Sequence, residues 1–500
     1  MNNLPKEKNF FYIYLIINAI LWICVQLLRT SLSIDSLEAI AWGELISFGT
    51  NKHPPLSGWL MAGFYNLCGQ HDFAAFILGQ ICIFIGLIFI YKLAKFFMSE
   101  EKALCSSMIL TSCYYYTYIV FIDNFNCNFL SMGIWPAVAY YFYKSVKENK
   151  IKDWIIFGII SGLGVLAKYQ IAFLFMALFL YLIICERKQF KQKGMYIAML
   201  AGFVVILPHL LWLYKTDFFS FIYMTERTEI GTHNTPKFLL AFARITFPVK
   251  FILDQILSVT SCIVLYLILA LKNKNIGFIS KEGNTSDKVF LFCICCVPVL
   301  LQGLMGAITG NRVQGIWGSI MVSFVGIGLF YFFPVKFKEN TFEYFMKWIY
   351  SLLIIWVIAV TIFAFAQVKY PISYPHKKIM TDFDKIWNES TNNAPLKYVG
   401  GGIDYIFQFR AYNKQHPTAI LETFGYKNPW IDHKDVINSG IILMDKSEEA
   451  VTGRVKEIVT LIPEDYSATP KEYKFTVKSK FGREKSYSFF YIIIPPMKKY

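Results

Sequence analysis

Charged residues are scarce in this chain of 500 residues: Asp, Glu, Lys and Arg together make up 17%, against about 25% in a typical soluble protein. Hydrophobic residues make up 55% of the chain and aromatic residues 18%. A chain of this composition has too little polar surface to cover a globule in water, so it buries apolar side chains in lipid. The composition excludes an ordinary soluble protein and predicts an integral membrane protein.

Basic segments that stand clear of the hydrophobic runs are also lacking. The net charge of +15 could suggest a nucleic-acid partner. In a membrane protein, however, such an excess usually reflects Lys and Arg in cytoplasmic loops. No nucleic-acid partner is therefore predicted, and membrane lipids are the expected surroundings.

Cysteine is absent after residue 300, and nearly all of the eleven cysteines lie inside apolar runs. Cys293, Cys295 and Cys296 resemble a metal cluster, but they lie in VFLFCICCVPVLL with no histidine or carboxylate nearby. Buried thiols that behave as small hydrophobic residues explain this pattern better. Neither a metal ion nor another cofactor is predicted.

Long apolar runs dominate the first three quarters of the chain. A membrane-spanning helix needs about 20 apolar residues, and the first run is too long for a signal peptide and is read as a retained span. The predicted spans lie near residues 9–29, 72–98, 103–121, 125–146, 153–168, 170–186, 195–215, 250–272, 288–309, 315–334 and 345–369. The predicted fold is an α-helical polytopic membrane protein with about 11–13 transmembrane helices.

Lys and Arg collect in alternate loops between these spans. Clusters occur at 144–152, 187–193, 272–288 and 336–338. The intervening loops carry scattered single cations, chiefly Lys52, Lys168 and Arg312. Because cytoplasmic loops are enriched in Lys and Arg, the N-terminus is predicted to be cytoplasmic, and an odd number of spans places the C-terminus outside.

The composition changes at about residue 371. Short strand-like pieces (IILMD, YKFTVKSK, SYSFFYIII) alternate with helical ones (IDYIFQFRAY, SEEAVTGRVKEIV), and FGREK is typical of a hairpin connection. We expect a transmembrane domain at 1–370, with its site in the first outer loop at 30–71, and an extracytoplasmic α/β domain at 371–500.

The first outer loop carries the carboxylates of Asp35 and Glu38, and His53, in SIDSLEAIAWGELISFGTNKHPPLSGWL. Apolar residues recur there at helical spacing, which predicts a short surface helix, and His53 with the two prolines after it begins a second one. Asp35 and Glu38 also match a D-x-x-E capping box, so a purely structural role remains open for both. His53 could equally be a simple loop residue.

Further polar residues map to the same outer side. Asp123 lies between the third and fourth spans, Lys168 at the outer end of the fifth, Arg227 in the loop 216–249, and Arg312 after the ninth. Charged groups at membrane depth usually face a cavity or a partner. Asp123 could instead cap the fourth span, and Lys168 could extend to the interface from a lipid-facing position. Together they predict a site at the membrane surface that is open to a lipid-borne anion.

The first outer loop resembles that of the polytopic glycosyltransferases of the GT-C type. The resemblance rests on IDSLEAIAW followed by HPPLSGWL, an acidic residue just after the first span and then (H/K)PPL-x-x-W. The most similar group comprises bacterial relatives of the protein O-mannosyltransferases and of the lipid A aminoarabinose transferase. DNFNCN, GLGVLAKYQ and PHLLWL also look similar to stretches of these proteins. His53 stands where a lysine is usual.

This resemblance implies an inverting enzyme of a bacterial inner membrane with its site on the periplasmic face. The donor would be a polyprenyl-phosphate-linked sugar, and the acceptor a lipid or glycan such as lipid A. Asp35 would be the catalytic carboxylate, which accepts the acceptor's proton or stabilises positive charge on the sugar. The implied substrate-binding residues are Glu38, His53, Asp123, Lys168, Arg227 and Arg312.

Two other functions fit parts of the pattern. A transporter or flippase of lipid-linked saccharides would show repeated halves and interrupted helices that face each other near the bilayer midplane, and the sequence shows no repeat of fixed period. A receptor or assembly factor would use the C-terminal domain to bind a partner. That function would leave the carboxylates of the first loop unexplained.

Overall fold

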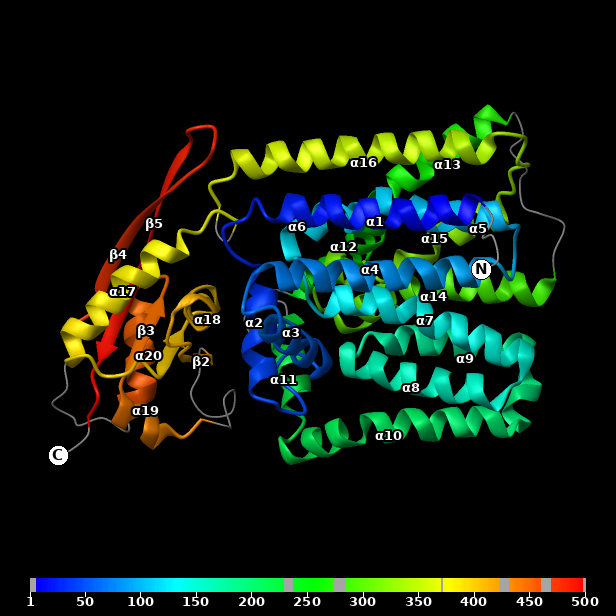
Figure 1. The fold of residues 1–500 in the computed structure, drawn as a ribbon. Helices are drawn as coiled ribbons and strands as arrows, with labels where there is room; N and C mark the ends of the chain where they lie inside the picture. Colours follow the sequence, from blue (N-terminus) through cyan, green and yellow to red (C-terminus); the bar gives the residue numbers. More distant parts are fainter. Residues whose placement is uncertain are drawn as a thin grey trace.

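A computed structural model describes residues 6–228, 237–273, 284–369, 372–421, 431–459 and 469–497. The described chain has two parts: a bundle of long helices, and a smaller part with a β-sheet beyond one end of the bundle (Figure 1). The bundle contains α1 (Lys6–Gln26), α4 (Phe73–Ala94), α5 (Glu100–Met108), α6 (Tyr118–Asp123), α7 (Cys127–Glu148), α8 (Ile151–Ala167), α9 (Ile171–Cys185), α10 (Lys193–Lys215), α12 (Lys237–Ser258), α13 (Thr260–Lys272), α14 (Thr285–Thr309), α15 (Val325–Phe332) and α16 (Thr341–Ala366).

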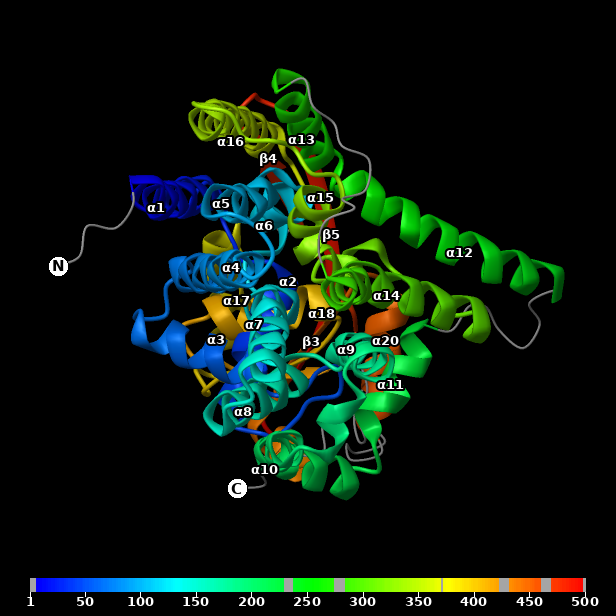
Figure 2. The same ribbon diagram turned by 90° about the vertical axis from the view of Figure 1, so that its right-hand side faces the viewer.

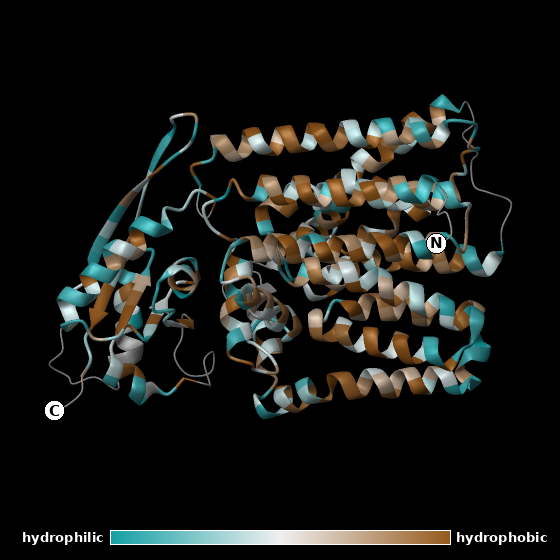
Figure 3. Cartoon of the chain, viewed as in Figure 1, coloured by the Kyte–Doolittle hydropathy of each residue, from teal (hydrophilic) through white to brown (hydrophobic). Residues whose placement is uncertain are grey.

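The bundle helices match the predicted spans. Five of the described helices (α1, α4, α10, α14 and α16) are long and apolar enough to cross a membrane, and two bent helix pairs bring the number to seven. Shorter apolar helices such as α8 and α9 run alongside them (Figures 1 and 2). Hydrophobic residues predominate along the bundle and hydrophilic ones gather near its ends (Figure 3). The prediction of a polytopic helical membrane protein is confirmed.

Two predicted spans are broken rather than straight. The helices at Glu100–Ser112 and Tyr114–Asp123 meet at 76°, and those at Ala241–Ser258 and Thr260–Lys272 meet at 45°. The two breaks contact each other, since Ser261 Oγ donates a hydrogen bond to the Ser112 carbonyl at 2.6 Å. A break leaves backbone carbonyls without their hydrogen-bond partners in the helix. At membrane depth such groups must be hydrogen-bonded within the protein, and hydroxyl donors such as that of Ser261 do this.

Two outer-loop helices, α2 (Ile34–Glu44) and α3 (Leu56–Leu67), lie between the bundle and the sheet-containing part (Figure 1). They cross at Gly43 and Gly58, where a Cβ on Gly43 would lie 1.9 Å from the Gly58 carbonyl oxygen. Only glycine permits this approach. It sets α2 firmly on α3, and the short helix predicted in the first outer loop is confirmed, although it is buried on most of its faces rather than on one stripe. The second helix begins at Leu56, with Pro55 as its N-cap rather than its first residue.

The remaining described part is an α/β unit. It contains α17 (His376–Thr391), β1 (Tyr398–Gly401), α18 (Ile403–Tyr412), β2 (Thr418–Leu421), α19 (His433–Ser439), β3 (Ile441–Asp445), α20 (Glu448–Val459), β4 (Lys471–Lys478) and β5 (Glu484–Ile494). The strand order is β2-β1-β3-β5-β4. β1, β2 and β3 are parallel, and β5 pairs antiparallel with both β3 and β4. The strands predicted at IILMD, YKFTVKSK and SYSFFYIII are confirmed, as is the hairpin at FGREK.

The two ends of the described chain lie at opposite ends of the bundle. α1 and α16 both start at the end far from the sheet, where Lys6 and Glu343 lie 3.9 Å apart (Figure 1). α1 finishes beside the α/β unit, since the Thr30 amide donates to the Ile372 carbonyl at 3.0 Å. This arrangement is the one that an odd number of crossings produces.

Candidate active site

The N-terminus of α2 is capped by Ser33 and not by Asp35. Ser33 has extended backbone angles, and its hydroxyl accepts a hydrogen bond from the Ser36 amide at 3.3 Å. The same hydroxyl donates to the Asp123 carbonyl. The capping-box interpretation of Asp35 and Glu38 is therefore wrong, because serine caps as well as aspartate does and stands where the helix begins. Asp35 lies in the first turn with its carboxylate free for other contacts.

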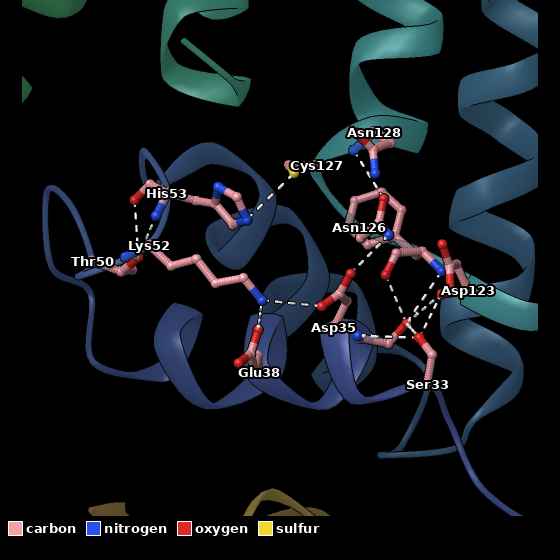
Figure 4. Close-up of polar contacts among 12 residues, drawn as sticks. Ser33, Asp35, Glu38, Thr50, Lys52, His53, Asp123, Asn126, Cys127 and Asn128 are labelled. Atoms are coloured by element: carbon pink, nitrogen blue, oxygen red, sulfur yellow. Dashed lines mark hydrogen bonds and ion pairs between the residues drawn. The ribbon is translucent and has the colours of Figure 1, made fainter. Parts of the chain in front are cut away.

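Asp35 and Glu38 of α2 share one ammonium group. Lys52 Nζ lies 3.1 Å from Asp35 Oδ1 and 2.7 Å from Glu38 Oε2 (Figure 4). The Glu38 side chain is only 4% exposed, whereas that of Asp35 is 42% exposed. Glu38 is thus a buried anchor for Lys52, and Asp35 is the carboxylate that a substrate can reach.

Lys52 is a site residue that the sequence did not reveal, because it was counted only as a single loop cation. Its backbone is held by Thr50, whose hydroxyl accepts from the amides of Lys52 at 3.2 Å and His53 at 2.9 Å. The ammonium also lies 5.9 Å from the ring centroid of Trp42, within range for a cation–π contact. The only feature of the local sequence that could have indicated a role for Lys52 was its position directly before His53 and the two prolines.

The first turn of α7 forms the opposite wall of the site. Asn126 caps this helix, its side chain accepting from the amides of Asn128 and Phe129, so the prediction of Asp123 as a cap is wrong. Asn126 Nδ2 also donates to Asp35 Oδ2 at 3.2 Å. Asp123 ends α6 beside these residues (Figure 4).

Lys168 reaches the same turn of α7 from the end of α8. Its ammonium donates to Asn128 Oδ1 at 2.5 Å, and the residue is only 9% exposed. The interpretation of Lys168 as a cation that extends to the lipid interface is therefore wrong. Asn126 therefore holds the Asp35 carboxylate, and Asn128 holds the Lys168 ammonium, at the first turn of α7.

His53 completes this cluster as a neutral imidazole. Its Nε2 lies 3.7 Å from Cys127 Sγ. Burial lowers the pKa of His53 to about 3, and the neighbouring Lys52 and Lys168 cations add to the effect. A phosphate would therefore meet His53 as a hydrogen-bonding group without charge.

The pKa of Asp35 moves the other way from that of a simply buried acid. Partial burial tends to raise it, but the Lys52 ammonium, His53 and the hydrogen bond from Asn126 together outweigh burial, and the pKa of the Asp35 carboxyl lies below its usual value. Asp35 is therefore a carboxylate at neutral pH, with one oxygen bound to Lys52 and the other to Asn126.

The loop that carries Lys52 and His53 is fastened to the bundle. His209 Nδ1 in α10 lies 2.6 Å from the Phe48 carbonyl oxygen, and its Nε2 lies 2.8 Å from the Tyr169 hydroxyl. Ser220, in α11 (Phe219–Thr228), donates to the Thr50 carbonyl at 2.6 Å. These contacts give the loop a defined conformation although it has no regular structure.

The two remaining predicted residues lie elsewhere. Arg312 lines a separate cavity of about 750 Å³ together with Lys250, Asp254 and residues of both helix breaks, such as Tyr114 and Ser261. Arg227 belongs to α11, but its side chain lies outside the described part of the structure. Among the described residues, no group of three or more His, Cys, Asp or Glu side chains could hold a metal ion.

Comparisons with known proteins give a family match and two curated relatives. Residues 52–212, which include Lys52, His53, Asp123 and Lys168, match the model of the family described as dolichyl-phosphate-mannose-protein mannosyltransferase. Two curated relatives are the lipopolysaccharide core galacturonosyltransferases RgtA and RgtB of Rhizobium johnstonii, each 24% identical, over 204 and 186 residues. The RgtA match covers 40% of this chain, which spans 40% of that relative's length, and the RgtB match covers 37% of each.

Solved structures give more distant matches. The crystal structure of ArnT from Cupriavidus metallidurans bound to undecaprenyl phosphate matches with a TM-score of 0.48 and 10% identity, covering 97% of this chain and 98% of that one. The archaeal oligosaccharyltransferase AglB from Archaeoglobus fulgidus matches with a TM-score of 0.41 and 12% identity, covering 97% and 74%. The family match over residues 52–212 and the curated relatives confirm the resemblance predicted from the first outer loop, which is to the polytopic membrane glycosyltransferases of the GT-C type.

Proposed function

We propose that this protein is a glycosyltransferase that moves a monosaccharide from a polyprenyl-phosphate donor to a lipid or glycan acceptor of the cell envelope, such as lipid A. The observation that carries the proposal is the pairing at α7: Asn126 holds the exposed Asp35 carboxylate, and Asn128 holds the Lys168 ammonium two residues further on. A sugar phosphate needs both groups, one beside its anomeric carbon and one beside its leaving phosphate.

In this mechanism the acceptor hydroxyl oxygen forms a bond to the anomeric carbon of the donor sugar. The bond between that carbon and the phosphate oxygen breaks, and polyprenyl phosphate leaves with the electron pair. Asp35 takes the hydroxyl proton as the bond forms, or stabilises the positive charge on the ring. Attack from the face opposite the phosphate inverts the anomeric configuration.

Cations neutralise the charge that develops on the leaving phosphate. Lys168 would take this role, which its position beside the first turn of α7 supports, and neutral His53 would add a hydrogen bond. Arg312 lies in the separate cavity of about 750 Å³, whose aromatic residues such as Tyr114 and Trp356 suit the prenyl chain, so it would bind the donor from that cavity. Glu38 acts indirectly, by holding Lys52 against Asp35.

The names of the curated relatives support an envelope acceptor, since both are described as lipopolysaccharide core galacturonosyltransferases. The proposed orientation places the N-terminus in the cytoplasm and the α/β unit in the periplasm of a bacterial inner membrane. The site would then meet a donor in the outer leaflet.

Mass spectrometry of envelope glycolipids tests the proposal. A strain that lacks the gene should lose one sugar-sized mass increment from lipid A, the core or another envelope glycan. Purified protein in vesicles should restore the increment when it is supplied with polyprenyl-phosphate sugar. An unchanged glycolipid and glycan profile, with no transfer by the purified protein, would refute the proposed activity.

We expect Lys168→Ala and Arg312→Ala each to weaken donor use about 10- to 150-fold, because a hydrogen bond to a charged group contributes about 1.5–3 kcal/mol. The measurement is the KM for the donor at equal amounts of folded protein. Lys144→Ala is a matched control, since Lys144 pairs with Asp153 at 2.8 Å in a structural ion pair outside the site. Normal donor KM values in both test variants would remove these residues from the phosphate site.

One observation favours a second candidate, a flippase of lipid-linked saccharides. The two broken helix pairs meet at Ser112 and Ser261 and line the cavity that contains Arg312, as interrupted helices do in transporters. Vesicles separate the two candidates. Movement of a labelled polyprenyl-phosphate sugar across the bilayer without any transferred sugar would favour the flippase.

A further inference from the structure

The α/β unit contacts α2 at both ends through one helix, α18. At the N-terminal end, the Tyr412 hydroxyl accepts from the Leu32 amide at 2.8 Å and donates to Asp72 Oδ2 at 3.0 Å. At the C-terminal end, Arg410 Nε donates to Glu44 Oε2 at 2.6 Å, and its Nη2 contacts the same oxygen. Arg410 and Glu44 are 18% and 19% exposed, so this ion pair is largely shielded from water.

Beside the Arg410–Glu44 pair, at the C-terminal end of α2, the apolar contact is incomplete. Trp42 of α2 meets Phe407 of α18 edge to face, with 6.4 Å between ring centroids. Beside them a cavity of about 180 Å³ separates α2 from α18 and β2. On its other sides α2 is held by the Gly43–Gly58 crossing with α3 and by hydrogen bonds from Ser33 and Ser36 to carbonyls near the start of α7. On the side that faces α18, where space is unfilled, the polar contacts at the two ends of α2 hold it in place.

We propose that α18 clamps α2 and thereby positions Asp35, so that the C-terminal α/β unit is a positioning element of the active site. Tyr412 and Arg410 are the positioning residues. The proposal rests on the proposed function for the role of Asp35, while the clamp itself is a statement about the position of a helix.

Asp35 and Glu44 lie on the same short helix, so a change at Glu44 can move Asp35 directly. An α-helix rises about 1.5 Å per residue, so α2, with its 11 residues, is about 16 Å long and carries Asp35 in its first turn and Glu44 in its last. Glu44 directly follows Gly43, so its pair with Arg410 sets the angle at which α2 lies on its crossing with α3. Asp35 lies about 12 Å along the helix from that crossing, so a small rotation there displaces it. A displacement of about 1 Å at a reacting group can lower the rate about 10²-fold.

The test compares Arg410→Glu, Glu44→Arg and the double exchange with wild type in membranes that contain equal amounts of protein. Arg410→Glu sets two carboxylates against each other and should lower kcat about 10- to 100-fold. The donor KM should change less than about twofold, because Lys168 and Asn128 hold each other through their own hydrogen bond. The double exchange restores opposite charges and should recover most of kcat.

Hydrogen–deuterium exchange of the peptide over residues 30–50 gives a readout independent of activity. Exchange in α2 should rise in Arg410→Glu and return to the wild-type level in the double exchange. The matched control is Arg454→Glu, which breaks a similarly shielded pair within the same unit, Arg454 Nε lying 3.2 Å from Asp445 Oδ2. This control should leave both kcat and exchange in α2 at wild-type levels.

Each outcome decides the proposal. Unchanged exchange in α2, or a double exchange that does not restore it, would overturn the clamp even if the wild type transfers sugar. Raised exchange with unchanged kcat would overturn the positioning of Asp35. If the wild type transfers no sugar, the proposed function fails, and the exchange data still decide the clamp. Glu44→Gln, which weakens the pair without repulsion, replaces Arg410→Glu if that variant does not fold.

Discussion

Asp35→Asn is expected to lower the rate of sugar transfer about 10²- to 10⁴-fold, which is the usual contribution of a general acid or base. The substitution keeps the shape of the side chain but removes the charge that Lys52 contacts at 3.1 Å. Asp35→Ala should be no worse than Asp35→Asn, because both lack the carboxylate. The measurement is transfer in membranes that hold equal amounts of each variant.

Ser33→Ala is the control for helix capping in this experiment. Loss of a serine cap costs about 0.5–2 kcal/mol of stability, whereas Asp35→Asn leaves the cap intact. Ser33→Ala should therefore lower the thermal midpoint more than Asp35→Asn does and reduce transfer per folded molecule far less. Near-normal turnover by Asp35→Asn would exclude the catalytic role, and Asp123 would be the next residue to test.

Lys52→Met should lower the free energy of unfolding by about 3–5 kcal/mol, the usual effect of removing one partner of a buried ion pair. The reason is that the substitution takes away the ammonium 2.7 Å from the Glu38 carboxylate, which is only 4% exposed. Thermal unfolding in detergent measures the loss. Lys52→Met combined with Glu38→Gln should recover much of it, because the buried charge is then gone as well.

Lys150→Met is the matched control for Lys52. Lys150 also lies 2.7 Å from a carboxylate, that of Glu148, but its side chain is 68% exposed, and exposed pairs contribute about 0–1 kcal/mol. Equal losses in the two variants would contradict a buried ion pair at Lys52.

Lys52 also keeps the pKa of Asp35 below its usual value. The acidic limb of the rate–pH profile should therefore move to higher pH in Lys52→Met.

The helices of the bundle could be predicted well from the sequence, because a helix that crosses a membrane needs an uninterrupted run of about 20 apolar residues. The boundary between α8 and α9 was predictable for the same reason, since Lys168, Tyr169 and Gln170 interrupt the run. The break near Cys113 was not predictable, because the predicted span 103–121 runs through it without interruption. Hydropathy shows that a segment is apolar but not whether its helix bends.

The site could be predicted only in part. Asp35, Glu38, His53 and Lys168 do gather around α7. The sequence also allowed Asp35 to be the N-cap of α2, but Ser33 caps that helix. Serine and aspartate cap helices about equally well, so local sequence could not choose between them. Lys52 and Arg410 were missed because their partners lie outside any local pattern, Arg410 being 366 residues from Glu44.

This long separation has a consequence for biogenesis. Thr30, Leu32 and Glu44 are translated early, whereas their partners Tyr374, Tyr412 and Arg410 follow 344, 380 and 366 residues later. In the proposed orientation the nascent chain has inserted every described helix of the bundle into the membrane, and exported α18, before α2 acquires these contacts. If α18 positions Asp35 as proposed, α2 reaches its final position only after these late-translated residues have crossed the membrane.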